Sequence, residues 1–511
     1  MIFVTSNRPT REQIIELART DPEAIADLVL MLWDQVVELQ ATVKRLELKV
    51  AELERNSRSS SKPPSSDKGN FTNPPKPKSL RGKSGKKPGG QEGHCGETLR
   101  QSEVPDRIID HRIDGDTLCS ACGEVFGECP TGSAPLDRKT CERRQVFDLP
   151  PIRLEVTEHR AEKRGCAGCG TVTTASFPET ASAPVQYGPQ VQAIALYLGG
   201  YQLLPYQRLT ETFSELFNCP LSAGTLANFV KRGGVSAALA MEPVREALVR
   251  AEVAHADETG CTVHGKRHWL HVFSTRLLTC LHVDGNRGRK AMQRMGLLER
   301  FRGSLIHDCL GAYFAFTLCR HFLCNAHLQR ELIYLHEQMD QPWAGKMIDL
   351  LLEAKQLRES TKSPPGTDDC VLDEGVIQSI RNRYSDIVLE GLEMNPEPPP
   401  PPPGKRGKIK RSKALNLLIR LEDRYEEIMG YFEYGHVPYD NNQAERDLRM
   451  MKVREKISGT FRSEGHAKAF CDLRSVIASA RKQSLPMLET LTALIRSPRQ
   501  LGDRLAKAEG T

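Results

Sequence analysis

The chain has 511 residues, of which 39% are hydrophobic, so it can bury several cores, and at roughly 100–200 residues per domain we expect about three or four units. No run approaches the ~18 consecutive apolar residues that span a bilayer, which argues against an integral membrane protein. The formal net charge of +6 is too small to indicate a partner by itself. Its distribution is more informative, because Lys and Arg gather in residues 58–87.

The 15 cysteines are expected to be reduced. The first residues, MIFVTSNRPTREQ, hold no apolar stretch behind a basic start, so we expect no secretory signal and a cytoplasmic location. Disulfides are rare in a reducing cytosol. Cysteine pairs are therefore interpreted first as metal ligands.

Residues 22–56 show the heptad repeat of a coiled coil. Valines recur every seventh residue, and leucines recur with the same period three residues later. The positions are Val29, Val36, Val43 and Val50, with Leu32, Leu39, Leu46 and Leu53. A β-branched residue at a with Leu at d favours a parallel two-stranded coil, so we predict a homodimer or a larger assembly. The alternative is an amphipathic helix packed against its own domain.

Residues 57–92 are rich in Ser, Pro, Gly and Lys, and Asp67 is the one acid between Arg58 and Lys87. This stretch has too little apolar surface to fold, so we predict a flexible basic linker. It is either an arm that follows DNA or a solvated connection.

Residues 93–180 contain two Cys-x₂-Cys pairs, Cys119 with Cys122 and Cys166 with Cys169. Two thiolates on a tight turn suit half of a tetrahedral Zn²⁺ site, so the four cysteines predict a structural Zn²⁺. The segment between the pairs is longer than the usual ~15–20 residues. Another ligand set therefore stays open, as do two metal-free turns; the other candidates in this region are Cys129, Cys141, His94 and His111.

Residues 187–250 are predicted to be helical. A helix over 209–217, a turn over 218–222 and a helix over 223–231 have the spacing of a helix-turn-helix, whose second helix could enter the major groove of DNA. A helical hairpin in an ordinary core is the alternative.

Residues 251–460 have a different sequence pattern from the helical region before them. Short apolar runs separated by turn-forming residues predict strands at 253–257, 269–275, 277–283 and 303–308. Helical periodicity then predicts an insertion at about 325–430, interrupted by a proline run and a basic stretch. A helical segment at 461–511 closes the chain.

Two acids are placed where apolar runs end. Asp257 follows VAHA and Asp308 follows SLIH, so each is expected at the C-terminal tip of a strand. If the two strands are neighbours, their carboxylates converge at one sheet edge and repel each other. A divalent cation relieves that repulsion, and oxygen ligands suit Mg²⁺ or Mn²⁺.

A third acid is expected from a helix. Glu445 lies in YDNNQAERDLRMMKVREK, where Asn441 or Asn442 can cap the helix start. Composition alone does not separate Glu445 from Asp440, Asp447 and Glu258. Cys324 and His327 have ligand spacing, but we expect them to pack or to support the site rather than bind a metal.

Four motifs resemble the insertion sequence 66 family of bacterial transposases. They are ADETG, IHDCLGAYF, CNAHLQREL and DNNQAERDLRMMKVREKISGTF. The zipper-like helix, the linker ending in KPGGQEGH, the paired cysteines and the helical region from YGPQV extend the resemblance over nearly the whole chain.

The resemblance implies a multidomain α+β protein. Its parts are a coiled coil, a zinc-binding module, a helical DNA-binding region, and an RNase H-like α/β catalytic domain with a helical insertion and C-terminal helices. It implies that Asp257, Asp308 and Glu445 are the catalytic, metal-binding acids of a DDE transposase. Such an enzyme cuts transposon ends and joins them to target DNA with Mg²⁺ or Mn²⁺.

Further expectations follow from the resemblance. The partners are transposon-end and target DNA, with accessory transposition proteins a further possibility, and the location is cytoplasmic and nucleoid-associated. Two alternatives remain open: a catalytically silent DNA-binding regulator derived from a transposase, and an RNase H-like nuclease without strand transfer.

Overall fold

The computed structural model describes residues 10–53, 99–127, 136, 141–150, 152–178, 181–361, 372–398 and 411–510. The chain divides into two compact units, one formed by Met1–Pro74 with Val156–Thr511 and the other by Pro75–Glu155. The predicted linker at 57–92, the proline run and most of the basic stretch after it, His94 and Cys129 lie outside the described residues.

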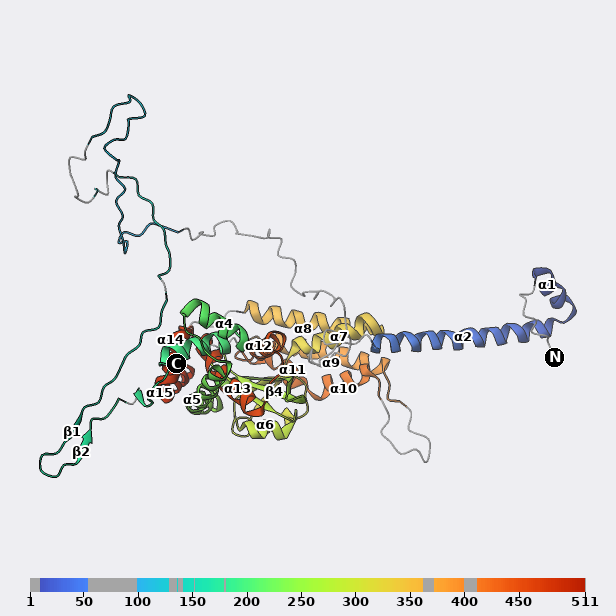
Figure 1. Cartoon of the computed structure of the whole chain (residues 1–511). Coiled ribbons are helices and arrows are strands. Elements are labelled where there is room, and N and C mark those ends of the chain that lie inside the picture. The colour runs from blue at the N-terminus through green and yellow to red at the C-terminus, as the bar shows by residue number, and fades with distance from the viewer. Residues whose placement is uncertain are drawn as a thin grey trace. The chain divides into compact units, whose positions relative to one another are not determined.

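The N-terminal segment contains two helices, α1 (Arg11–Thr20) and α2 (Pro22–Leu53). Helix α2 covers the predicted heptads almost to their end, and Figure 1 draws it as one uninterrupted helix. The first three heptads leave their apolar side chains between 48% and 63% exposed: Val29, Leu32, Val36, Leu39, Val43 and Leu46. The chain thus forms the predicted helix and presents the heptad stripe on its surface.

A five-stranded mixed sheet forms the centre of the larger unit. Its strands are β3 (Val253–Val263), β4 (Lys266–Ser274), β5 (Thr279–Asp284), β6 (Ser304–His307) and β7 (Arg320–Leu323). The order is β5-β4-β3-β6-β7. The neighbours β3, β4 and β5 are antiparallel, whereas β6 runs parallel to both β3 and β7. Strand β7 was not predicted, because its four residues begin with Arg and His and show no apolar run.

Strand β3 differs from the sequence prediction. It was expected to end at Asp257, but it continues to Val263 because residues 258–263 pair with β4. The hairpin turns at His264 and Gly265, whose φ angles are 50° and 72°. Positive φ at both central residues is the requirement of a tight two-residue hairpin turn. Asp257 therefore lies in the middle of β3, not at its tip.

The pleat of β3 sends alternate side chains into different cores. Ala254 and Ala256 join a core built mainly by helices α5 (Ala223–Arg250), α6 (Arg289–Met295), α13 (Glu464–Lys482), α14 (Met487–Arg496) and α15 (Pro498–Lys507). Cys261 and Val263 face a smaller core with α12 (Asn442–Ser458). The odd-numbered positions, Asp257 included, thus face the helix that carries Glu445.

The helical region before the sheet contains α3 (Pro189–Leu196), a π-helical turn (Tyr197–Tyr201), α4 (Tyr206–Phe217) and α5. Asn218 is left-handed at the end of α4, and Ser222 caps α5 by accepting a hydrogen bond from the Thr225 amide. The turn agrees with the prediction. The second helix does not end near residue 231; it runs to Arg250, because Met241, Val244 and Leu248 continue its buried face.

The predicted helical insertion contains five helices within its described residues. They are α7 (Asn325–Met339), α8 (Pro342–Ser360), α9 (Glu374–Met394), α10 (Lys413–Asp423) and α11 (Tyr425–Glu433), and in Figure 1 they lie together in yellow and orange. They have their own core, which includes the fully buried Trp343 and also receives Phe322 and Leu323 of β7. Among the described residues no helix combines the length and apolarity needed to cross a membrane.

Candidate active site

Asp257 and Asp308 are brought together by the parallel pairing of β3 with β6. His255 is paired with Ile306, so two further residues along each strand lead to Asp257 and Asp308 at the same level. Asp308 directly follows β6 and is 7% exposed. The Asp257 carboxylate accepts the Glu258 amide over 2.7 Å, and the Asp308 carboxylate accepts the Leu310 amide over 2.9 Å.

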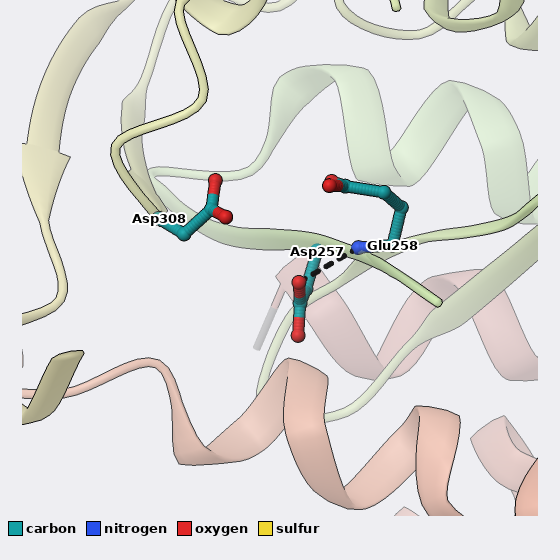
Figure 2. Close-up of side chains that lie close together, drawn as sticks. All are labelled: Asp257, Glu258 and Asp308. Atoms are coloured by element: carbon teal, nitrogen blue, oxygen red, sulfur yellow. Dashed lines mark hydrogen bonds between the residues drawn. The ribbon is translucent and has the colours of Figure 1, made fainter. Parts of the chain in front are cut away.

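A third carboxylate, that of Glu258, completes a close group. One carboxylate oxygen from each of Asp257, Glu258 and Asp308 lies within 4.8 Å of the others. Figure 2 shows the Glu258 and Asp308 carboxyl groups facing each other, with Asp257 pointing to the other side of the strand. The convergence expected of the two aspartates is therefore observed, although only Asp308 lies at the end of its strand.

The electrostatics of this group favour a bound cation. Burial, followed by the charge of Glu258, raises the pKa of Asp257 well above its usual range. The same two causes raise the pKa of Asp308 to about 7. Clustered carboxylates disfavour one another's ionised form, and a divalent cation removes that penalty. A buried set of carboxylate oxygens is also the ligand type that Mg²⁺ and Mn²⁺ prefer. The residues present therefore fit the expected metal.

Glu258 is held from two sides. Arg287 contacts one carboxylate oxygen through Nε at 2.9 Å and through a terminal nitrogen at 2.8 Å, and the Tyr313 hydroxyl donates to the other oxygen over 2.8 Å. The Glu258 side chain is fully buried. The sequence offered little reason to place Glu258 in this group, because adjacent residues on a strand point to opposite faces of the sheet and Glu258 directly follows Asp257.

Glu445 lies in the first turn of α12 but outside this close group. Its carboxylate oxygen is 3.5 Å from Nε2 of His327 and 3.6 Å from a guanidinium nitrogen of Arg330, both on α7. Its charge contributes to the raised pKa of Asp257, so the two carboxylates sense each other. Asn441 is the residue before α12, as expected, but its side chain makes no capping hydrogen bond.

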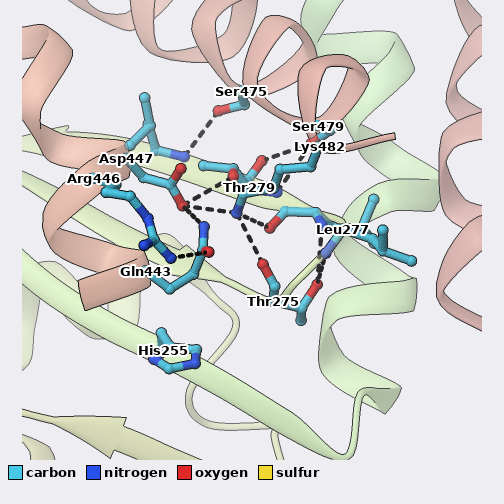
Figure 3. A network of polar contacts seen from close by, with 12 residues as sticks. His255, Thr275, Leu277, Thr279, Gln443, Arg446, Asp447, Ser475, Ser479 and Lys482 are labelled. Atoms are coloured by element: carbon cyan, nitrogen blue, oxygen red, sulfur yellow. Dashed lines mark hydrogen bonds and ion pairs between the residues drawn. The ribbon is translucent and has the colours of Figure 1, made fainter. Parts of the chain in front are cut away.

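The rival acids of the same segment have other partners. Asp440 accepts the backbone amide and the side-chain amide of Asn442, so it closes a local turn. Asp447 lies 2.8 Å from the Lys482 ammonium and accepts the Thr279 hydroxyl over 3.2 Å (Figure 3). Both acids make short structural hydrogen bonds, whereas the His327 and Arg330 contacts of Glu445 are 3.5 and 3.6 Å long, which favours Glu445 as the third acid of the site.

An open hollow of about 1480 Å³ lies next to the start of α12. His255, Gln443 and Arg446 line it, together with residues at the C-terminal ends of α5 and α15. Its walls carry both acids and bases, and none of Asp257, Asp308 or Glu445 belongs to them. The group of carboxylates, and not this hollow, therefore defines the candidate site.

Each predicted cysteine pair forms a knuckle. In the first, the Cys119 amide donates to the Glu124 carbonyl over 2.8 Å, and the Gly123 amide donates to the Cys119 carbonyl over 2.9 Å. Gly123 has a φ of 75°, which glycine adopts without a steric penalty. Hydrogen bonds from the backbone at Ala121 and Cys122 lower the pKa of the Cys119 thiol, which favours the thiolate that a metal needs.

The second knuckle repeats this geometry. The Cys166 amide donates to the Thr171 carbonyl over 2.9 Å, and the Gly170 amide donates to the Cys166 carbonyl over 2.8 Å. Gly170 again has a φ of 75°. Short antiparallel strands, β1 (Lys163–Gly165) and β2 (Val172–Thr174), flank it. A hydrogen bond to the Thr171 hydroxyl lowers the pKa of the Cys169 thiol.

Comparison with known protein families identifies the class as that of the transposases. Residues 184–469 match the family described as "Transposase IS66 family". Because this match covers more than half of the 511 residues, the chain belongs to the IS66 family of transposases. The resemblance of the four sequence motifs is thereby confirmed.

Two further matches lie towards the N-terminus. Residues 127–170 match the zinc-finger binding domain of IS66 transposases, which supports a bound Zn²⁺. This match contains Cys129, Cys141, Cys166 and Cys169, whereas Cys119 and Cys122 precede it. Residues 7–100 match a family of unknown function, DUF6444. A comparison with curated proteins found no match.

Proposed function

We propose that the chain is a DDE transposase that cuts the ends of its insertion sequence and joins them to target DNA. The observation that carries this proposal is the register of β3 with β6, which brings the carboxylates of Asp257 and Asp308 into one group. Membership of the transposase family indicates that the substrate is DNA, and the acids indicate metal-dependent chemistry at phosphorus.

The sheet order supports an RNase H-like catalytic domain. Three antiparallel strands come first, and two strands are then added in parallel on the far side of the first strand. The first acid lies on that first strand, the second follows its parallel neighbour, and the third lies on a later helix facing the same side. Helices α7 to α11 form the insertion between the last strand and that helix.

In this proposal Asp257, Asp308 and Glu445 hold the divalent cations. Divalent cations bound there would activate the attacking oxygen and stabilise the leaving oxygen of a phosphodiester. The protein's task is positioning, because little covalent chemistry is asked of it. Water attacks the phosphorus at the transposon end, the P–O3′ bond breaks, and a 3′-hydroxyl is released. That hydroxyl then attacks a target phosphodiester and displaces the target strand's 3′-oxygen.

The remaining parts of the chain are assigned to DNA and to assembly. Cys119, Cys122, Cys166 and Cys169 are assigned to the binding of structural Zn²⁺, in a region of the chain that contacts the transposon end. The start of α5 offers Asn228, Lys231 and Arg232 as exposed side chains for DNA. The exposed heptad stripe of α2 pairs with the same stripe of a second chain as a parallel coil.

Point variants of the acids test the proposal. We expect Asp257→Asn, Asp308→Asn and Glu445→Gln each to abolish cleavage of end DNA in Mg²⁺, while binding of the end in a mobility-shift assay stays near wild type. Asp386→Asn, an exposed aspartate on α9, is the matched control and should cleave normally. Cleavage at wild-type rate by any of the three acid variants contradicts the assignment of that acid.

One assay separates the alternative functions. Pre-cut end DNA mixed with a plasmid target should give strand-transfer products with the wild-type chain. A protein that cuts ends but never joins them is an RNase H-like nuclease. A protein that binds ends and neither cuts nor joins them is a regulator derived from a transposase.

A further inference from the structure

Asn441 is completely buried at the start of α12 and contacts two other elements. Its Oδ1 lies 2.9 Å from Nδ1 of His255, and its Nδ2 donates to the Ala256 carbonyl over 2.8 Å, so it holds β3 at the residues just before Asp257. Its backbone amide donates to the Cys324 sulfur over 3.2 Å, so it also holds the start of α7.

The Asn441 side chain is not used as a helix cap. An asparagine before a helix usually accepts a hydrogen bond from one of the first free amides. Here no such bond is made, and both polar atoms of the side chain are directed to β3. The Asn441 carbonyl still accepts the Glu445 amide over 3.3 Å. The residue thus joins the strand of Asp257 to the helical turn of Glu445.

The start of α7 is fixed both to the loop before α12 and to helix α11. The Asn325 amide donates to the Tyr439 carbonyl over 3.1 Å, and the Asn325 side chain donates to the Ile428 carbonyl over 2.9 Å. Cys324 is 3% exposed. This docking directs His327 to Glu445, which explains the Cys-x₂-His spacing through helix docking and needs no metal.

Helix α12 has a second attachment at Asp447, between its first and second turns. Asp447 contacts Thr279 of β5 and Lys482 of α13, and Gln443 donates to the same Asp447 oxygen over 3.1 Å (Figure 3). Attachments at Asn441 and Asp447 lie on either side of Glu445. They fix the position of this turn along the axis of α12, and its rotation about that axis, relative to the sheet.

We propose that Asn441 is the positioning residue that sets the Glu445 carboxylate relative to Asp257, and that His327, held by the Cys324 docking contact, orients that carboxylate. The inference rests on the proposed function, because it concerns the metal ligands assigned there. Asn441 itself does not touch the reacting groups; it acts through Glu445.

Metal affinity measures this role directly. Mn²⁺ binding to the full-length protein is followed by isothermal titration calorimetry, in parallel with cleavage of end DNA and thermal unfolding. We expect Asn441→Ala to weaken Mn²⁺ binding by about 10–100-fold, the range found when groups that orient metal ligands are removed. The matched control is Asn442→Ala, which changes the next, exposed asparagine and should bind Mn²⁺ as the wild type does.

A double-mutant cycle separates positioning from folding. If Asn441 acts through Glu445, the Asn441→Ala/Glu445→Gln protein binds Mn²⁺ no more weakly than Glu445→Gln alone. A purely structural role predicts losses that add. If Asn441→Ala does not fold, His255→Phe removes the same bond from the strand side and takes its place in the cycle.

The outcomes are distinguishable. Additive losses, or wild-type Mn²⁺ affinity in Asn441→Ala beside a weakened Glu445→Gln, overturn the inference and leave the proposed triad intact. Wild-type affinity and cleavage in Glu445→Gln remove Glu445 from the triad, and the inference fails with it. Non-additive losses with an unchanged Asn442→Ala support it.

Discussion

The Asp447 carboxylate and the Lys482 ammonium form a buried ion pair at 2.8 Å, with side chains only 10% and 11% exposed. The ammonium also donates to the carbonyls of Thr275 and Leu278, over 2.9 and 3.0 Å. All three of its N–H groups are therefore used. This one lysine connects α13 with α12 and with the turn between β4 and β5.

Replacing Lys482 should be strongly destabilising. Lys482→Met removes the cation from the buried Asp447 carboxylate, which keeps only the neutral donors Thr279 and Gln443, and takes one hydrogen bond from each of two carbonyls. Removing one partner of a buried ion pair costs about 3–5 kcal/mol of unfolding free energy. Urea denaturation followed by tryptophan fluorescence measures it. The control is Lys346→Met, which breaks an exposed pair with Glu390 and should cost less than about 1 kcal/mol. Equal effects of the two substitutions would show that the buried pair is not special.

The raised pKa values of Asp257 and Asp308 predict that metal binding releases protons. The pKa of Asp308 is raised to about 7, and burial is the first cause for both aspartates. An acid with a raised folded-state pKa stabilises the fold while it is protonated, and this contribution is lost as the pH rises through the folded-state value. The metal-free protein should therefore lose stability as the pH rises from about 4 through about 7, and excess Mn²⁺ should restore it.

Calorimetry tests this linkage without a DNA substrate. Mn²⁺ titrations near pH 6.5 in two buffers of different ionisation enthalpy should show proton release, and the apparent affinity should increase with pH. After burial, the charge of Glu258 is the next cause that raises both pKa values, and Glu258→Gln removes it, so the affinity profile of this variant should move to lower pH. Proton uptake, or affinity independent of pH, is incompatible with metal bound by these carboxylates.

The sequence predicted the convergence of the Asp257 and Asp308 carboxylates better than it predicted the strands around them. VAHA and SLIH are apolar enough to indicate strands, and the helical periodicity around Glu445 indicated α12. The sequence does not reveal that β3 continues past Asp257, because residues 258–263 are stabilised by pairing with β4. Strand β7 lacks a local signal altogether.

The contacts of Asn441 could not be predicted from the residues near it in the sequence. As a residue before a helix it was expected to cap, which is a contact within a few positions. Its actual partner, His255, lies 186 positions away in sequence. Glu258 was open as a rival of the other acids. It joins the close group because the neighbouring strand β6 places Asp308 beside it. The sequence of β3 alone does not reveal which strand is its neighbour.

Zinc content tests the ligand set of the cysteine module. We expect one Zn²⁺ per chain by elemental analysis, and its loss in both Cys119→Ser and Cys166→Ser, because a tetrahedral site needs all four thiolates. Cys141→Ser should keep the metal. Loss of zinc in Cys141→Ser with retention in Cys119→Ser would instead assign the ligands to the segment that matches the zinc-finger family, residues 127–170.

The heptad stripe of α2 predicts the assembly of the chain. In a parallel coil Leu39 is buried against its counterpart, and each buried leucine contributes about 1.5–3 kcal/mol. A charge at this position would have to be buried beside an identical charge, so Leu39→Glu should dissociate the dimer. Light scattering should then change from a mass near twice 57.1 kDa to the mass of one chain.

The matched control for this prediction is Glu38→Gln, which lies beside Leu39 but outside the a and d positions of the stripe. It should leave the dimer intact, because removing one charge from the solvated face of a coil changes little. End-DNA cleavage by Leu39→Glu carries further information. If the dimer holds two catalytic sites on two transposon ends, paired-end products should disappear while nicking of single ends persists. A Leu39→Glu protein that remains dimeric would show that α2 packs elsewhere.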